Sequence, residues 1–300
     1  MKIKVISKRK IFTDQNLKYW LLLPVFFVTL AVAIIPLVYS IGLSFFKWIV
    51  TRPDLPISFV GLGNWVYILG DITFWEALSK TLIFTASVIV IEFSLGLGIA
   101  LLLNRPFYGA KIILPLMILP VMLSPIVVGL MWRYLYNGDF GLVAWILKTI
   151  GFEKYSLLSY SSTALPAVLI TDIWHWTPFI FILIFAGLHS LPGAPFEAAR
   201  VDGATRGQIF RWVTLPLLKR VIMVAILLRT IDAFKIMDEI FIMTSGGPGR
   251  ATETLSMLIY RQSFRYFTMG KGAVLAVVSF VVILFMCQYF IKFAGRKEEA

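Results

Sequence analysis

Charged side chains inside apolar stretches are the first feature of this sequence that suggests chemistry. Arg229, Asp232 and Lys235 follow one another at three-residue spacing, which places them on one face of a helix. Two interpretations fit this spacing. Either the three charges form an intrahelical ladder of ion pairs that lets the helix enter an apolar environment, or their planar polar groups bind the hydroxyl groups of a solute beside neighbouring aromatic rings.

Two other apolar stretches also contain ionisable groups. Glu92 lies in the middle of one, and Asp172 and His175 lie on one helical face of the other, beside Trp176. Because an unpaired charge at the centre of a membrane costs about 2.5–3.5 kcal/mol or more, we expect Glu92 to face protein or water. As an ion relay, these groups would suit a stand-alone secondary transporter or channel, although the sequence has no duplicated half of the kind such transporters contain.

The sequence lacks the residue sets of catalysis and of metal binding. A single cysteine, Cys287, permits no intrachain disulfide and excludes a cysteine-based metal cluster. The glycine-rich stretch Ser245–Gly249 lacks the lysine of a phosphate-binding loop, so we interpret it as a turn. We therefore expect no catalytic residue, no metal and no cofactor on this chain.

The composition is that of a membrane protein. Of the 300 residues, 59% are apolar and 15% are charged, and the mean hydropathy is +0.86. Soluble domains have about 45–50% apolar residues and about 25% charged residues. So much apolar side chain requires lipid as its solvent, which excludes soluble enzymes. In a soluble protein the net charge of +12 would suggest nucleic acid, but here the positions of the charges matter more, and we expect no nucleic-acid partner.

Apolar runs of bilayer-crossing length predict an all-α membrane protein with six transmembrane helices. The third of these helices should be kinked, because it contains Pro115, Pro120 and Pro125. The basic start and the triplet Ala31-Val32-Ala33 are typical of a cleavable signal, but the apolar run continues well beyond a signal core, so we interpret it as an uncleaved span. The predicted spans are Trp20–Phe46, Thr81–Leu103, Ile112–Trp132, Ala167–Leu188, Val221–Phe241 and Gly272–Ile291.

The distribution of Lys and Arg predicts the orientation, because positive residues close to span ends stay in the cytoplasm. One set of alternate segments holds 16 of them with five acids, and the other holds 10 with eight acids. The richer set is 1–19, 104–111, 189–220 and 292–300, and the poorer set is 47–80, 133–166 and 236–271. We therefore predict one membrane domain over 20–291, cytoplasmic tails over 1–19 and 292–300, and a cytoplasmic loop over 189–220.

The inner loop 189–220 predicts two short helices joined by a turn. Pro195 suits the first turn of a helix, where its missing N–H costs nothing, and Glu197 is favoured there by the helix dipole. Gly203 can adopt a left-handed conformation that ends this helix, Gln208–Trp212 can form a second turn, and Pro216 opens the fifth span. Small and charged residues without a nucleophile or metal-ligand set indicate a docking element.

The spacing in this loop resembles a known family. Glu197-Ala198-Ala199, three residues, Gly203, nine residues and Val213-x-Leu215-Pro216 are similar to the loop of binding-protein-dependent ABC importer permeases, with Val213 where that family usually has Ile. The resemblance implies the ABC importer type I permease fold. It also implies that Glu197, Ala198, Ala199, Asp202, Gly203, Leu215 and Pro216 couple this chain to an ATPase.

Further motifs resemble the sugar-uptake branch of that family, specifically its short, maltose-permease-like, N-terminal-type subunit. The matching stretches are Ala233-Phe234-Lys235, Met243–Leu255 and Phe59-Val60-Gly61-Leu62-x-Asn64. The resemblance implies a bacterial plasma-membrane protein that pairs with a second, different six-helix permease. Two ABC ATPase subunits, which carry ATP and Mg, and an extracytoplasmic solute-binding protein would complete the importer, with lipid around it.

The same resemblance implies a solute pathway along the third and fifth spans. The corresponding positions are Gly129, Leu130 and Arg133, and Arg229, Asp232, Ala233 and Ile236. Because neutral-sugar pockets show Asn or Ser where this chain has Arg and Asp, two interpretations stay open: an anionic saccharide, or a pocket held by the partner permease. An ABC permease for a polyamine or an inorganic anion shares the inner-loop pattern and is the alternative.

Overall fold

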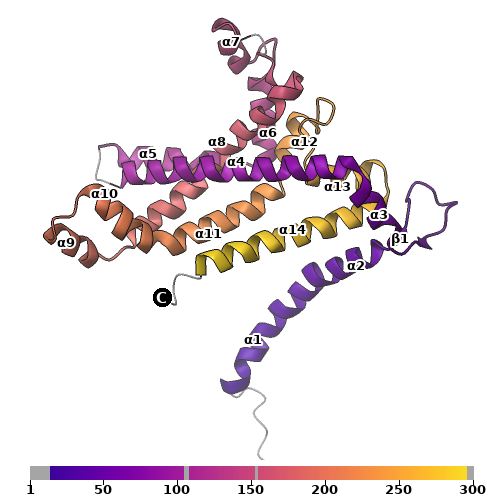
Figure 1. Ribbon diagram of the computed structural model, residues 1–300, viewed down its shortest axis with the longest axis horizontal. Helices are drawn as coiled ribbons and strands as arrows, with labels where there is room; N and C mark the ends of the chain where they lie inside the picture. The colour runs from indigo at the N-terminus through magenta and orange to yellow at the C-terminus, as the bar shows by residue number, and fades with distance from the viewer. Residues whose placement is uncertain (1–13, 105–107, 153–154, 296–300) are drawn as a thin grey trace, which may run out of the picture.

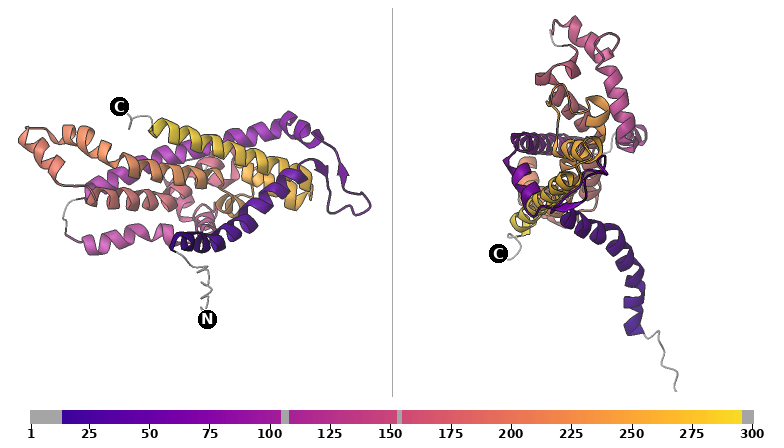
Figure 2. Two further views of the ribbon diagram at one scale, coloured as in Figure 1. Left: turned by 90° about the horizontal axis from the view of Figure 1, so that it is seen from below. Right: turned by 90° about the vertical axis from the view of Figure 1, so that its right-hand side faces the viewer.

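The computed structural model describes residues 14–104, 108–152 and 155–295, and most of these are helical (Figure 1). Its longest helices are α4 (Ile72–Leu103), α8 (Ser161–His189), α11 (Leu215–Phe234) and α14 (Met269–Gly295). In both Figure 1 and Figure 2 they run lengthwise beside one another. Together they form the body of the protein.

The first predicted span meets the body at its second half, where α2 (Ile35–Leu43) packs against α14, whereas its first half stands apart. Helix α1 (Asp14–Thr29), the π-helical segment η1 (Leu30–Ile34) and α2 follow one another as a long apolar rod. The right-hand view of Figure 2 shows the start of this rod projecting away from the other helices. No residue in the most apolar part of Trp20–Leu43 is buried by the described chain. This rod therefore needs lipid or another protein to cover it.

Four helices of the described chain are long and apolar enough to cross a membrane, and each contains most of a predicted span. They are Trp20–Leu43, Ile72–Leu103, Ser161–His189 and Met269–Lys292. The last three begin earlier than predicted, and the first ends at Leu43 rather than Phe46. The prediction of an all-α membrane architecture is confirmed. The third and fifth predicted spans differ from the prediction.

The third and fifth predicted spans are broken helices. The third consists of α5 (Ala110–Ile118), the 3-10 turn η2 (Pro120–Met122) and α6 (Pro125–Leu135). The span therefore breaks at Pro120 and Pro125, where proline has no N–H to continue the helix, and Ser124 before Pro125 has the extended angles that a following proline favours. Pro115, where a kink was also predicted, lies inside α5 and does not end that helix. The prediction of a continuous Val221–Phe241 was wrong, since α11 ends at Phe234 and α12 (Asp238–Met243) begins only after three residues.

Short elements gather at the two ends of the body. At one end lie the inner-loop helices α9 (Ala194–Val201) and α10 (Arg206–Ile209), the π-helical segment η4 (Phe210–Thr214) and the end of α14 (Figure 1). The opposite end carries the antiparallel strands β1 (Phe46–Lys47) and β2 (Ser58–Phe59), then α3 (Gly63–Gly70), α13 (Leu255–Tyr260) and the π-helical segment η5 (Arg261–Arg265). Helix α7 (Leu142–Thr149) and the 3-10 turn η3 (Leu157–Ser159) follow α6.

An ion pair anchors the loop between α12 and α13. Glu253 is buried, and its Oε1 lies 2.8 Å from Nη1 of Arg261. Burial raises the pKa of the Glu253 carboxyl, and the Arg261 guanidinium opposes that shift. On the adjacent side, Nζ of Lys80 in α4 donates to the Arg250 carbonyl at 2.7 Å. The loop is thus tied to both α4 and η5.

Helices α4 and α8 share an extensive contact in the body, and it depends on Gly96. A Cβ atom at Gly96 would lie 2.7 Å from Cγ2 of Ile180 and 3.0 Å from the backbone nitrogen of Phe181. Small residues allow helices in a membrane to approach in this way. Ala100, Phe181 and Ile184 continue the contact as part of one buried cluster.

We expect Gly96→Val to separate α4 from α8 and to lower the free energy of unfolding by about 1–3 kcal/mol, because the added side chain overpacks the contact. Gly98→Val is the matched control, since a Cβ at Gly98 meets nothing within 4 Å. Thermal stability of the purified protein in detergent checks both. Equal loss of stability in the two variants would contradict the assigned contact.

Candidate functional site

A buried arginine joins three helices. Arg229 of α11 is 1% exposed, and its Nε and Nη2 atoms donate to Oε2 and Oε1 of Glu92 in α4 at 2.7 and 3.0 Å. Nη2 also donates to Oδ2 of Asp172 in α8, and Nη1 donates to Oδ2 of Asp232 at 2.8 Å. The guanidinium carbon lies 5.0 Å from the ring centroid of Trp176 in α8. We call Glu92, Asp172 and Arg229 the buried ion triad.

The buried ion triad accommodates three charges among apolar helices by pairing them with one another. A charge inside a membrane must be paired or reach water, and here each of the three has partners of opposite charge. The prediction that Glu92 faces protein is therefore confirmed. The ladder interpretation is correct only in part, because the Arg229–Asp232 pair forms, whereas Lys235 makes no ion pair among the described residues. Sequence reasoning missed the contacts between helices, although an arginine and two carboxylates in separate apolar spans were a usable signal.

A second polar contact holds both broken helices against α8. The Nε2 atom of His175 donates to the backbone carbonyl of Leu123 at 3.2 Å, and Nδ1 lies 2.9 Å from Oε1 of Glu239. Leu123 is in the break of the third span, where its carbonyl lacks a helical partner, and Glu239 is in the first turn of α12. His175 thus satisfies one break and fixes the helix that follows the other.

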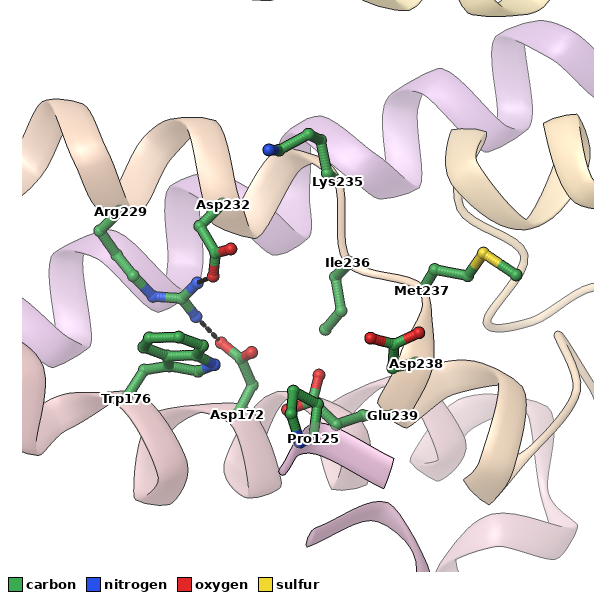
Figure 3. Close-up of a pocket in the computed structure, with 10 residues that line it drawn as sticks. All are labelled: Pro125, Asp172, Trp176, Arg229, Asp232, Lys235, Ile236, Met237, Asp238 and Glu239. Atoms are coloured by element: carbon green, nitrogen blue, oxygen red, sulfur yellow. Dashed lines mark hydrogen bonds and ion pairs between the residues drawn. The ribbon is translucent and has the colours of Figure 1, made fainter. Parts of the chain in front are cut away.

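A cavity of about 170 Å³ lies where the two breaks meet α8 (Figure 3). Irregular backbone at membrane depth is tolerated where it is buried in protein or lines a water-filled cavity, and this arrangement meets that condition. We call this space the polar cavity. Its lining residues are Pro125, Asp172, Trp176, Arg229, Asp232, Lys235, Ile236, Met237, Asp238 and Glu239.

The predicted pathway residues divide into two groups. Arg229, Asp232 and Ile236 line the polar cavity, whereas Ala233 is fully buried and does not line it. The residues on α6 pack against α12 instead or face outward. A Cβ at Gly129 would lie 3.2 Å from Cβ of Ile242, Arg133 Nη1 donates to the Ile242 carbonyl at 3.0 Å, and Leu130 is 43% exposed.

Other cavity residues were absent from the predicted pathway. Asp172, Trp176 and Pro125 were noted in the sequence for other reasons, and Asp238 and Glu239 enter because α12 starts at the break. No local pattern marks that break, since Lys235, Ile236 and Met237 are not helix breakers. Only the packing of α12 against α6 reveals which side chains turn towards the cavity.

The inner loop has the predicted helix–turn–helix form. Pro195 and Glu197 lie in the first turn of α9, and Gly203 has φ +77° after its end. The nitrogen of Ala204 donates to the Ala199 carbonyl at 2.9 Å, which closes the turn, and Thr205 and Gln208 form a capping box for α10. The predicted turn at Gly203 is confirmed.

The predicted coupling residues lie on an accessible part of this loop. Glu197, Ala198, Asp202, Gly203 and Pro216 are exposed, and Ala199 and Leu215 are half-buried. Apolar neighbours are exposed as well, with Val201 at 87% and Trp212 at 69%. Exposed apolar side chains beside charged ones are typical of a surface that binds another protein.

Comparison with known proteins gives the class of this molecule. Residues 92–293 match the family model described as "Binding-protein-dependent transport system inner membrane component", and the chain belongs to this family. The expectation of a multi-pass transport subunit rather than an enzyme is confirmed. Membership of this family also decides against the stand-alone secondary transporter.

Individual relatives and one solved structure agree with that class. The chain is 34% identical to the trehalose/maltose transport system permease protein MalF of Thermococcus litoralis over 97% of both chains. It is 32% identical to the sulfoquinovosyl glycerol transport system permease protein SmoG of Agrobacterium fabrum over 95% of this chain and 92% of that one. A bacterial ABC transporter that imports the acidic polysaccharide alginate matches with a TM-score of 0.80 and 22% identity, over 95% of this chain and 97% of that one. The expected permease fold is confirmed.

We expect Arg229→Met to lower the free energy of unfolding by about 3–5 kcal/mol, because it leaves the buried Glu92 and Asp172 without their cation. Asp232→Asn should cost less than about 1 kcal/mol, since exposed ion pairs contribute little and the Asp232 side chain is 50% exposed. Thermal unfolding in detergent measures both.

A combined variant separates lost charge from lost packing. Arg229→Met together with Glu92→Gln and Asp172→Asn removes all three charges of the triad, and we expect it to recover most of the stability. If the triple variant is as unstable as Arg229→Met alone, charge balance is not what the triad supplies.

Proposed function

We propose that this chain forms half of the translocation pathway of an ATP-driven importer of sugars or oligosaccharides and that its polar cavity lies on the path of the solute. The observation that carries the proposal is the convergence of two helix breaks, four carboxylates and one indole on a single cavity within an apolar body. Carboxylate oxygens accept hydrogen bonds from hydroxyl groups, and an indole offers an apolar face to a sugar ring. The trehalose/maltose permease among the relatives supports this solute class.

Three surfaces of the chain correspond to three partners in this proposal. The rod Trp20–Leu43, unburied by the described chain, lies against lipid and a second six-helix permease subunit. The exposed loop of α9 and α10 contacts one of two ABC ATPase subunits, which bind ATP and Mg. The end of the body that carries α3 and α13 faces an extracytoplasmic solute-binding protein, as the family description supports.

The proposal places the chain in the bacterial plasma membrane with both termini in the cytoplasm. The excess of Lys and Arg in the tails and in the inner loop supports this orientation. In Figure 1, α9, α10 and the end of α14 lie at the same end of the body, as a shared cytoplasmic side requires.

A polyamine is the second candidate solute. The carboxylates of the polar cavity would bind ammonium groups as readily as hydroxyls. An inorganic anion fits less well, because those carboxylates would repel it. Sugar permeases among the relatives favour the saccharide.

The first test of the function is transport by the assembled importer. We expect this chain to co-purify with a second permease and an ATPase, and the complex in proteoliposomes to take up maltose or trehalose when ATP and the cognate binding protein are present. Uptake of spermidine without uptake of either sugar would replace the saccharide by the second candidate. A chain that purifies alone and transports without ATP would overturn the proposal.

The inner loop supplies the matched variants for this test. Gly203→Val forces a β-branched residue into a left-handed conformation, at a strain of about 1–2 kcal/mol at the docking helix. The complex should assemble but lose most of its coupled uptake. Gly203→Asn is the control, because Asn tolerates positive φ, and should retain more uptake than Gly203→Val. If Gly203→Val and Glu197→Ala both transport normally, the loop does not couple.

The orientation of the chain in the membrane can be tested by labelling single cysteines introduced into the Cys287→Ser variant. Cysteines at the exposed positions Thr51 and Asp139 should react with a membrane-impermeant maleimide in intact spheroplasts. A cysteine at the exposed inner-loop position Gly207 should react only after permeabilisation. The reverse labelling pattern would place the inner loop outside the cell and remove its contact with an ATPase.

A further inference from the structure

We infer that the polar cavity is electronegative and passes uncharged saccharides while rejecting acidic ones, with Asp232 and Asp238 as the residues that set this selectivity. The inference rests on the proposed function, because it names the substrate class of the same cavity. It decides against an anionic saccharide, which was one of the two interpretations of Arg229 and Asp232 that the sequence left open. It also separates this chain from the solutes named for some of its relatives, which include an acidic polysaccharide and sulfoquinovosyl glycerol.

The first observation is that Arg229 is already occupied. A guanidinium has five N–H donors, and four hydrogen bonds from Arg229 go to carboxylates of this chain: two to Glu92, one to Asp172 and one to Asp232. Its face lies against Trp176. An acidic sugar would have to displace one of these carboxylates, which would leave a buried charge without its partner.

The second observation is the balance of charges around the cavity. Its lining contains four carboxylates and two cationic side chains. Arg229 faces both Glu92 and Asp172, so the buried ion triad already holds more carboxylates than cations. In Figure 3 the Lys235 side chain extends away from Asp172 and Trp176. Lys235, the cationic lining residue outside the triad, therefore places its charge at the margin of the cavity.

The remaining acceptors suit hydroxyl groups. Asp232 gives one oxygen to Arg229, and its side chain is 50% exposed. Asp238 is exposed at the start of α12, and no ion pair of the described residues involves it. Glu239 is held by His175 instead. Two carboxylates from either side of the break at Lys235–Met237 are thus free to accept hydrogen bonds from sugar hydroxyls, which are neutral donors.

Charge also affects entry. A cleft with low-dielectric walls lined by one sign of charge concentrates counter-ions and depletes co-ions. This field would repel an acidic saccharide before any contact forms, whereas it would not repel a neutral one. Selectivity by repulsion needs no precise fit, which suits a cavity that must release its solute.

The charge of the cavity can be measured without knowing the solute. The experiment uses the purified complete importer with Cys287→Ser and Met237→Cys, whose thiol would lie in the cavity lining. It compares the rates of reaction with cationic trimethylammonium-ethyl and anionic sulfonato-ethyl methanethiosulfonate. A cysteine at the exposed position Thr51 in the same background gives the reference ratio.

We expect the cationic reagent to be favoured at Met237→Cys by about tenfold over the reference ratio. Adding Asp232→Asn and Asp238→Asn should remove most of this preference, and Lys235→Gln should increase it. A ratio equal to the reference, or a preference for the anionic reagent, would overturn the inference whatever the solute proves to be. A thiol that reacts with neither reagent would show that solutes do not reach this cavity, which overturns it as well.

An uptake assay is the second test of the charge selectivity. Proteoliposomes with the cognate binding protein are offered a neutral disaccharide and its monouronate, each alone. Wild type should import the neutral sugar at least about tenfold faster, and Asp232→Asn/Asp238→Asn should reduce that ratio several-fold. Equal or faster import of the uronate by wild type sinks the charge selectivity and leaves the proposed function intact. Import of neither sugar, with the thiol preference present, sinks the saccharide function and leaves the electronegative cavity.

Discussion

The contact between the Arg229 guanidinium and the carboxylates of Glu92 and Asp172 is the constraint on which the rest of the structure depends. In an apolar body these charges are stable only together, so α4, α8 and α11 must meet at one depth and in one rotation. Apolar packing alone would allow these helices to slide along one another, because lipid competes equally well for their side chains. The triad therefore sets the register in which Gly96 and Ile180 come into contact.

The position of the polar cavity follows from that register. Helix α11 reaches its end one turn beyond Arg229, and the break there lies opposite the proline break of the third span. His175, one turn from Asp172 on α8, then bridges both breaks through Leu123 and Glu239. The polar groups that a continuous helix would have satisfied internally are satisfied here by side chains, and the space left between them is the cavity.

One rigid element connects the inner loop with this cavity. Helix α11 begins at Leu215, directly after η4 and within the inner loop, and carries Arg229 and Asp232 near its other end. Its 20 residues span about 30 Å at 1.5 Å per residue. A displacement of α9 and α10 would therefore act on the ion triad and on the break that follows it. This arrangement gives the proposed coupling a physical route, because a helix transmits displacement along its axis while the break absorbs it.

The sequence by itself determined the features that depend on neighbours along the chain. Run length and composition gave the membrane class and most span positions, proline spacing gave the break in the third span, and Gly203 gave the turn of the inner loop. Each of these follows from solvation or backbone sterics within a few residues. Only the tertiary structure decided that Arg229 pairs with Glu92, 137 positions away, that α11 stops at Phe234, and that Asp238 joins Asp232 around one cavity. The physical reason is that the pairing of buried charges depends on which helices are neighbours, and helix packing is set by long-range contacts that no local pattern contains.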